Sequence, residues 1–182
     1  MRRVLIGTIG YHNLRDFSVG PMLLPRLQAM AWPPDVEAEE LNWGPIAIVQ
    51  NFQALEAPYD RVVILTARQQ GRRVGTLTLH RWMGGLPDAE RIQAHIAEAV
   101  TGVIGVENLL VIGEHFNIWP EEVFLVDVEP GPEEAGDTLT PAVEAAVPEI
   151  LKTVRRTALE DIKQLPLMEP IHGHLLGRYH AN

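Results

Sequence analysis

The stretch RVVILTA, residues Arg61 to Ala67, decides the fold class of this chain. It is almost wholly apolar and rich in β-branched residues, which is typical of a strand covered on both faces of a parallel sheet. Val4 to Ile9 and Val123 to Val128 have the same character, and Val36 to Leu41 is a weaker strand that carries charges. The sequence therefore predicts one mostly parallel sheet with a buried centre.

Segments with helical periodicity separate these strands. From Val19 to Met30 apolar residues return every three or four positions, and Ser18 precedes them as the expected N-cap. Because helices alternate with strands, we expect a three-layer α/β sandwich with a mostly parallel central sheet. The other expected helices are Pro45 to Leu55, Pro87 to Val100, Val106 to Phe116 and Thr140 to about Leu159.

Two segments depart from this alternation. Val74 to Trp82 alternates apolar and polar residues, which predicts an edge strand or the arm of a hairpin. Beyond Leu165 the chain loses periodicity and gains proline, glycine and histidine. We therefore expect one domain over residues 1–164 and an appended tail over residues 165–182, lying on the domain or loose in solvent.

Composition excludes several classes of function. The 182 residues are 46% hydrophobic and 21% charged, as in ordinary globular proteins. The net charge of −9 disfavours nucleic acid as a partner. The absence of cysteine excludes disulfides, thiolate metal sites and a cysteine nucleophile. No apolar run is long enough for a membrane span and Val4-Leu5-Ile6 is too short for a signal peptide, so we expect a cytoplasmic protein.

Common nucleotide and hydrolase motifs do not fit. Gly7, Gly10 and Gly20 near the first strand have the wrong spacing for a dinucleotide-binding loop, and no Walker lysine follows them. The sequence has no G-x-S-x-G elbow, so nothing supports a serine triad of the α/β-hydrolase type.

Three stretches together resemble a known family. The pattern G-x-G-N-x-L-x-x-D-[DE]-G-x-G aligns without gaps on Thr8 to Gly20, where Gly10, Asp16 and Gly20 agree with it. Tyr59 to Ala67 resembles the third strand of the same family, and Trp119 to Leu151 resembles its closing segment. These stretches are similar to the hydrogenase maturation proteases, metal-dependent endopeptidases that trim the C-terminal extension of the nickel-iron hydrogenase large subunit. The resemblance covers about residues 3 to 156 and implies their phosphorylase/hydrolase-like α/β fold.

The resemblance also implies where a metal would bind. The family uses an acidic residue in the first loop, an aspartate at the end of the third strand and a histidine at the start of a later helix. These positions fall on Phe17, on Thr66 and near Gly102. A phenyl group offers no lone pair and a neutral hydroxyl replaces a carboxylate poorly, so we expect no metal site, no cofactor and no catalytic residue of the family type. A relocated site using Asp16 or His95 is the alternative.

Without metal ligands, the same cleft suits binding. We expect Asp16, Phe17, Asn42, Trp43, Thr66 and Arg68 to line it at the carboxyl edge of the sheet, where open α/β folds bind ligands. Such a pocket is suited to a peptide tail or a small ligand. In the alternative interpretation, Phe17 and Trp43 merely fill the vacated space as core residues.

The histidines and the acidic clusters have simpler interpretations. His172, His174 and His180 have a spacing that chelates a metal if the tail is extended, but solvent-exposed side chains are the more common outcome. Isolated histidines are usually hydrogen-bonded surface residues, and acidic clusters are usually solvated loops. The isolated histidines are His12, His80, His95 and His115, and the clusters are Glu37/Glu39/Glu40 and Glu129/Glu133/Glu134/Asp137.

These observations leave two main hypotheses. The resemblance implies a partner, the hydrogenase-type large subunit or its C-terminal peptide, which the chain would bind without cleavage as an assembly factor or accessory subunit. The alternative is an active metal-dependent endopeptidase with a relocated metal site. A third class, a peptidyl-tRNA hydrolase or phosphorylase-like enzyme on a similar sheet, is disfavoured for RNA by the charge of −9.

Overall fold

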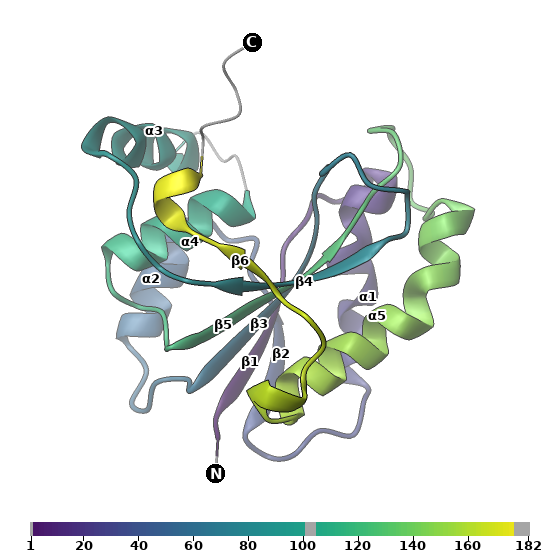
Figure 1. Ribbon diagram of the computed structural model, residues 1–182, viewed down its shortest axis with the longest axis horizontal. Coiled ribbons are helices and arrows are strands. Elements are labelled where there is room, and N and C mark those ends of the chain that lie inside the picture. Colours follow the sequence, from purple (N-terminus) through teal and green to yellow (C-terminus); the bar gives the residue numbers. More distant parts are fainter. Residues whose placement is uncertain (1, 101–104, 177–182) are drawn as a thin grey trace.

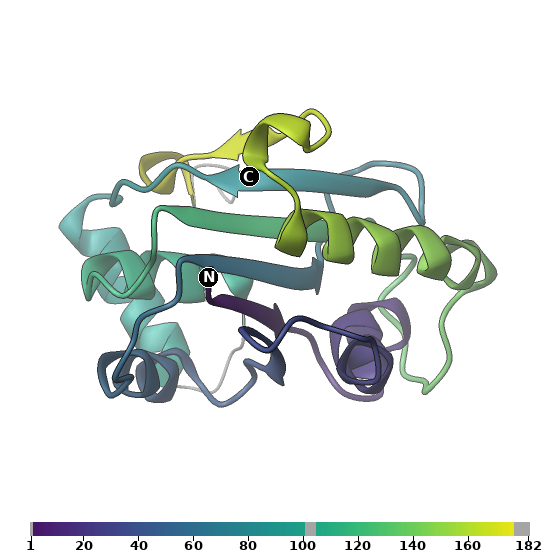
Figure 2. The ribbon, with the colours of Figure 1, turned by 90° about the horizontal axis from the view of Figure 1, so that it is seen from below.

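A six-stranded sheet organises the molecule (Figure 1). The computed structural model describes residues 2–100 and 105–176. The strand order is β2-β1-β3-β5-β4-β6, and Figure 2 shows β6 as the outer strand beside β4. The strands are β1 (Val4–Thr8), β2 (Val36–Glu40), β3 (Arg61–Ala67), β4 (Leu77–Trp82), β5 (Glu122–Val128) and β6 (Glu169–Ile171).

The sheet is mostly parallel, as the sequence predicts. Strands β2, β1, β3 and β5 run in parallel, whereas β4 is antiparallel to β5. The apolar runs belong to the central strands β1, β3 and β5, whose side chains are covered on both faces. The charge-bearing strand β2 lies at the edge.

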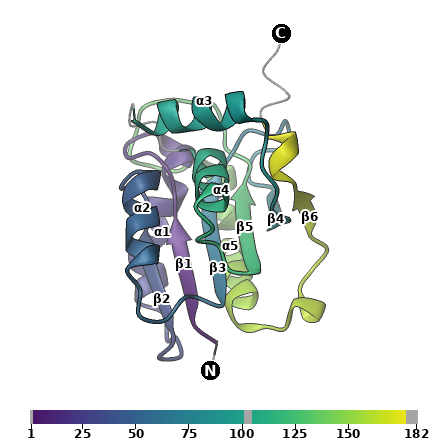
Figure 3. The ribbon, with the colours of Figure 1, turned by 90° about the vertical axis from the view of Figure 1, so that its left-hand side faces the viewer.

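Helices cover both faces of the sheet and complete the predicted three layers. One core cluster joins α1 and α5 to the sheet through residues such as Leu27, Val63 and Val147. The other joins α2 and α4 to the opposite face through residues such as Ile48, Ile64 and Leu110. Helix α3 contacts α4 and crosses the top of the molecule in Figure 3. The helices are α1 (Val19–Gln28), α2 (Pro45–Gln53), α3 (Ala89–Val100), α4 (Val106–His115) and α5 (Pro141–Leu159), with short 3-10 turns η1 (Arg15–Ser18), η2 (Ile162–Gln164) and η3 (Gly173–Leu175).

The expectation of an edge strand at Val74 to Trp82 is wrong. Strand β4 occupies this region, and β6 pairs with its outer side in parallel. Beyond β6, Gly173 packs so tightly on Gly85 that an added Cβ would stand 1.8 Å from the Gly85 carbonyl oxygen. Residues from the expected tail therefore complete the sheet, and the boundary at residue 164 stays a prediction. In the described ranges, no helix has the length and apolar character needed to cross a lipid bilayer.

Gly173→Ala should loosen the tail. The new methyl group has no space beside Gly85, and overpacking of this kind costs about 1–3 kcal/mol. We expect a matching fall in the free energy of unfolding in urea, together with faster amide exchange in β4 and β6.

The matched control is Gly105→Ala. Its Cβ would meet no atom within 4 Å, and its φ is an ordinary −112°. Equal effects of the two substitutions would contradict the close approach between Gly173 and Gly85.

Candidate functional site

Several of the predicted cleft residues meet at the carboxyl edge of the sheet. Turn η1, which carries Asp16 and Phe17, follows β1 and contacts β3. Thr66 is the second-last residue of β3, so it ends the strand at the same edge. Phe17 is half-buried, and its carbonyl accepts a hydrogen bond from the Tyr11 amide at 3.1 Å.

Asp16 is fully buried and holds the loops together. Its Oδ1 accepts a hydrogen bond from the Thr140 amide at 2.7 Å. Its Oδ2 accepts one from the Gly131 amide at 2.8 Å and one from the Thr140 hydroxyl at 2.7 Å. The carboxylate thereby ties η1 to the start of α5, and this use of both oxygens makes Asp16 a structural anchor.

The side chains of Asn42 and Trp43, which follow β2, lie in different surroundings. The Asn42 Oδ1 accepts a hydrogen bond from the Gly10 amide at 3.2 Å, and its Nδ2 donates to Glu40 at 2.5 Å. Asn42 thus joins the loops after β1 and β2. Trp43 is 56% exposed, donates its indole N–H to the Glu40 carbonyl and lines a groove between β2 and α2. It is therefore not a core residue, and its ring belongs to a different hollow from Arg68.

A buried ion pair lies where β3 and β5 end. Asp127 of β5 is fully buried and pairs in register with Thr66. Its Oδ2 accepts a hydrogen bond from the Arg68 Nε at 2.6 Å and forms an ion pair with the Arg68 Nη2 at 2.5 Å. The Arg68 Nη1 also contacts Glu107 of α4 at 2.9 Å. Arg68 therefore places a fixed guanidinium between the sheet and α4.

Burial shifts the pKa of two groups in this cluster. It raises the pKa of Asp127 to about 7, against the opposing effect of Arg68. Burial and then the charge of Arg68 lower the pKa of His80 to about 4. The His80 Nε2 stands 3.5 Å from the Asp127 Oδ2, and neither ring nitrogen has a hydrogen-bond partner among the described residues. At neutral pH the site thus combines a neutral imidazole with the ion pair between Asp127 and Arg68.

A cavity of about 770 Å³ opens beside this cluster. Residues from the C-terminal segment close one side of it, and an ion pair of 2.6 Å between Arg72 and Glu169 fixes that segment. The cavity is large enough for a short peptide segment. Its lining residues are Arg68, Gln69, Gln70, Arg72, His80, Glu107, Glu169, Pro170, Ile171, His172, Leu175 and Leu176.

Sequence reasoning missed most of this cluster. His80 was expected at the surface but is only 4% exposed, because β6 covers β4. Glu129 was expected in a solvated loop but is buried, and it accepts hydrogen bonds from the amides of Gln70 and Gly71. Asp127 was the available signal, since a carboxylate inside the apolar run VFLVDV must find a partner when the strand is buried.

The contacts of the other described histidines do not suggest a metal site. His12 contacts Glu40 at 2.7 Å, and His95 contacts Asn108. The rings of His172 and His174 lie 5.4 Å apart, while His180 is outside the described residues. Within residues 2–100 and 105–176, no three His, Asp or Glu side chains are grouped to hold a metal ion.

The fold is an α/β fold with a mostly parallel sheet, a class in which ligands commonly bind at the carboxyl ends of the strands. Neither a scan against protein-family models nor a search of curated proteins finds a match. Solved structures do match. An endopeptidase from Escherichia coli is 22% identical with a TM-score of 0.64, over 85% of this chain and 91% of that one.

Two further structures show the same likeness. The hydrogenase maturating endopeptidase HybD from Escherichia coli is 23% identical with a TM-score of 0.61, over 85% of this chain and 90% of that one. A hydrogenase 2 maturation peptidase from a Thaumarchaeota archaeon is 22% identical with a TM-score of 0.57, over 84% and 95%. The chain therefore has the hydrogenase maturation protease-like fold.

The residues at the implied metal positions do not fit a divalent cation. Phe17 has no donor atom and Thr66 offers a neutral hydroxyl. Asp127, the neighbour of Thr66 in the sheet, is already bound by Arg68. The third position, Gly102, lies outside the described residues.

Asp16→Ala should destabilise the fold. It would leave the buried amide of Gly131 and the half-buried amide of Thr140 without their acceptor, at a cost of roughly 2–4 kcal/mol in the free energy of unfolding. Urea unfolding measures this loss. Asp137→Ala, at an exposed position of the same loop, is the control and should change the free energy little.

The pKa shifts of Asp127 and His80 should have opposite effects on the pH dependence of the free energy of unfolding. Between pH 4 and 7 the native state binds the extra proton at Asp127, so this group lowers stability as pH rises. Between pH 4 and 6.5 the unfolded state binds the extra proton at His80, so this group raises stability as pH rises.

Single substitutions should separate the two effects. In His80→Gln, the free energy of unfolding should fall from pH 4.5 to 7 relative to the native protein. In Asp127→Asn it should rise over the same range. Urea unfolding at several pH values tests this, and parallel pH profiles in the two variants would contradict the shifts.

Proposed function

We propose that this chain binds a hydrogenase-type large subunit, or its C-terminal peptide, without cleaving it. In this role it serves as an assembly factor or an accessory subunit in the cytoplasm. The proposal starts from the fold shared with hydrogenase maturation peptidases, whose names associate those proteins with hydrogenase maturation. The sequence resemblance at Thr8 to Gly20 and Trp119 to Leu151 points the same way.

The guanidinium of Arg68 is the observation that carries the non-cleaving role. Family resemblance implies a metal ligand at Thr66, but the in-register neighbour of Thr66 is Asp127, which Arg68 holds at 2.5 Å. Arg68 thus binds the carboxylate next to the implied metal position, and a divalent cation placed there would have to compete with this guanidinium for Asp127. The carboxylate that could hold a metal in a peptidase of this fold is therefore already paired with a side chain of the chain itself.

The cavity beside Arg68 supports peptide binding. It combines charged groups with apolar side chains, including Ile171 and Leu175, within about 770 Å³. The side chain of Gln70 has a buried nitrogen with no partner among the described residues. A peptide carbonyl or carboxylate can accept from this group and from the edge of the Arg68 guanidinium.

A mixing experiment tests both parts of the proposal. The purified full chain is incubated with a nickel-loaded large-subunit precursor, complex formation is followed by size exclusion, and the C-terminal peptide is sought by mass spectrometry. We expect a stable complex with no released peptide. Arg68→Gln should weaken the complex about tenfold, as expected for one charged hydrogen-bonding group.

Arg26→Gln is the matched control, because Arg26 lies exposed on α1, on the other face of the sheet. It should bind like the native chain, and circular dichroism checks that both variants are folded. Failure to form a complex would contradict the binding role. Metal-dependent peptide release that is abolished by His95→Ala, in a variant that remains folded, would establish the relocated peptidase site instead.

A further inference from the structure

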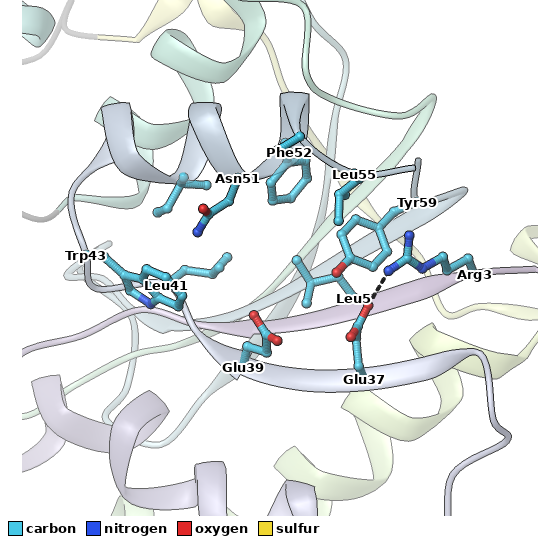
Figure 4. Close-up of a pocket in the computed structure, with 12 residues that line it drawn as sticks. Arg3, Leu5, Glu37, Glu39, Leu41, Trp43, Asn51, Phe52, Leu55 and Tyr59 are labelled. Carbon is cyan, nitrogen blue, oxygen red and sulfur yellow. Dashed lines mark hydrogen bonds and ion pairs between the residues drawn. The ribbon is translucent and has the colours of Figure 1, made fainter. Parts of the chain in front are cut away.

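A second hollow lies between β2 and α2, apart from the site beside Arg68 (Figure 4). Its volume is about 340 Å³. Aromatic and apolar side chains make up most of its wall, and two carboxylates of β2 project from one side. The lining residues are Arg3, Leu5, Glu37, Glu39, Leu41, Trp43, Ile48, Asn51, Phe52, Ala54, Leu55 and Tyr59.

One end of this groove already holds a cation from the chain itself. The Arg3 Nη2 contacts the Glu37 carboxylate at 3.1 Å. The Arg3 guanidinium carbon also stands 4.6 Å from the centre of the Tyr59 ring. A carboxylate and an aromatic ring together bind this guanidinium, in the geometry of an ion pair combined with a cation–π contact.

The other end of the groove also has a carboxylate and an aromatic ring, but no arginine or lysine of the described residues pairs with them. Glu39 lies two residues after Glu37, so the two side chains share one face of β2. Figure 4 shows Glu39 bordering the hollow between Glu37 and Trp43, with Asn51 opposite it on α2. Within the part of the chain that the structure describes, the side chain of Glu39 has no hydrogen bond or ion pair.

The walls around Glu39 are arranged before any ligand arrives. The Trp43 ring is exposed, yet its indole N–H is held by the Glu40 carbonyl. Leu41 and Ile48 are buried and form an apolar surface next to it. An aliphatic stem can pack on this surface while a charged head reaches the carboxylate.

We propose that this groove binds a lysine or arginine side chain of a partner polypeptide, with Glu39 and Trp43 receiving the charged head. The site is distinct from the cavity beside Arg68, so the inference does not depend on the hydrogenase partner. Charge complementarity selects the ligand, because the chain carries −9 overall and Glu39 is unpaired among the described residues.

The exposure of the groove explains why the source is a polypeptide. Glu39 and Trp43 are both exposed, so a side chain that projects from the surface of a partner protein can reach them. Such a partner does not extend the sheet, because the outward carbonyls of Ala38 and Glu40 already accept hydrogen bonds from Gln28 and from the Trp43 indole. The contact with Glu39 is therefore made by a side chain of opposite charge.

Fluorine NMR of the full chain labelled with 5-fluorotryptophan tests the proposal. The probe is the peptide acetyl-Ser-Gly-Arg-Gly-Ser-amide, and its neutral counterpart carries citrulline in place of arginine. The chain has four tryptophans, and Trp43→Phe assigns the signal of Trp43. We expect the arginine peptide to shift that signal saturably, with a dissociation constant of about 1 mM, and the citrulline peptide to leave it unchanged.

Glu39→Gln should weaken binding of the arginine peptide at least about five-fold, the effect of one partly screened ion pair. Glu144→Gln is the control, because Glu144 is exposed on α5 at the other face of the sheet. Equal shifts from both peptides, or binding unchanged by Glu39→Gln, would overturn the proposal. Tighter binding of 1,5-diaminopentane than of the peptide would assign the groove to a small amine and would also overturn it.

Discussion

The buried pair of Arg68 and Asp127 is the constraint on which the carboxyl edge depends. Asp127 stands inside a central strand, where an unpaired carboxylate would lose its hydration without compensation. Arg68 supplies two contacts to it and a third to Glu107 of α4. The same side chain therefore neutralises the centre of the sheet, fixes the loop after β3 against α4 and sets the charge of the adjoining cavity.

Much of the fold was predictable because its signals are local. An apolar run such as Val62 to Leu65 can satisfy its side chains only in a buried strand, and Thr140-Pro141 marks the start of the last helix. Strand β6 has no such signal. Its three residues are ordered by pairing with β4 and by the contact of Gly173 with Gly85, and such distant contacts leave no periodicity in the sequence.

The site was predictable only in part, for the same reason. Thr66 and Arg68 were expected at the edge because they end a recognisable strand, and the structure places them there. Their partners depend on tertiary pairing, since the buried His80 lies on a strand that is paired with β5 on one side and β6 on the other. Asp16 shows the converse case. Its place in the first loop suggests a binding residue, but both of its carboxylate oxygens accept hydrogen bonds that hold that loop in place.

The two hollows differ in how their charges are balanced. Beside Arg68, each arginine has a carboxylate partner, so that cavity presents balanced charges and would select a ligand chiefly by shape and hydrogen bonding. In the β2–α2 groove, Arg3 neutralises Glu37 but leaves Glu39 unmatched among residues 2–100 and 105–176. An unmatched carboxylate on an acidic protein attracts cations from a distance, and salt weakens this attraction. Under the two proposals, the groove at the sheet edge would therefore select its ligand by charge, and the cavity at the strand ends would select a peptide by shape.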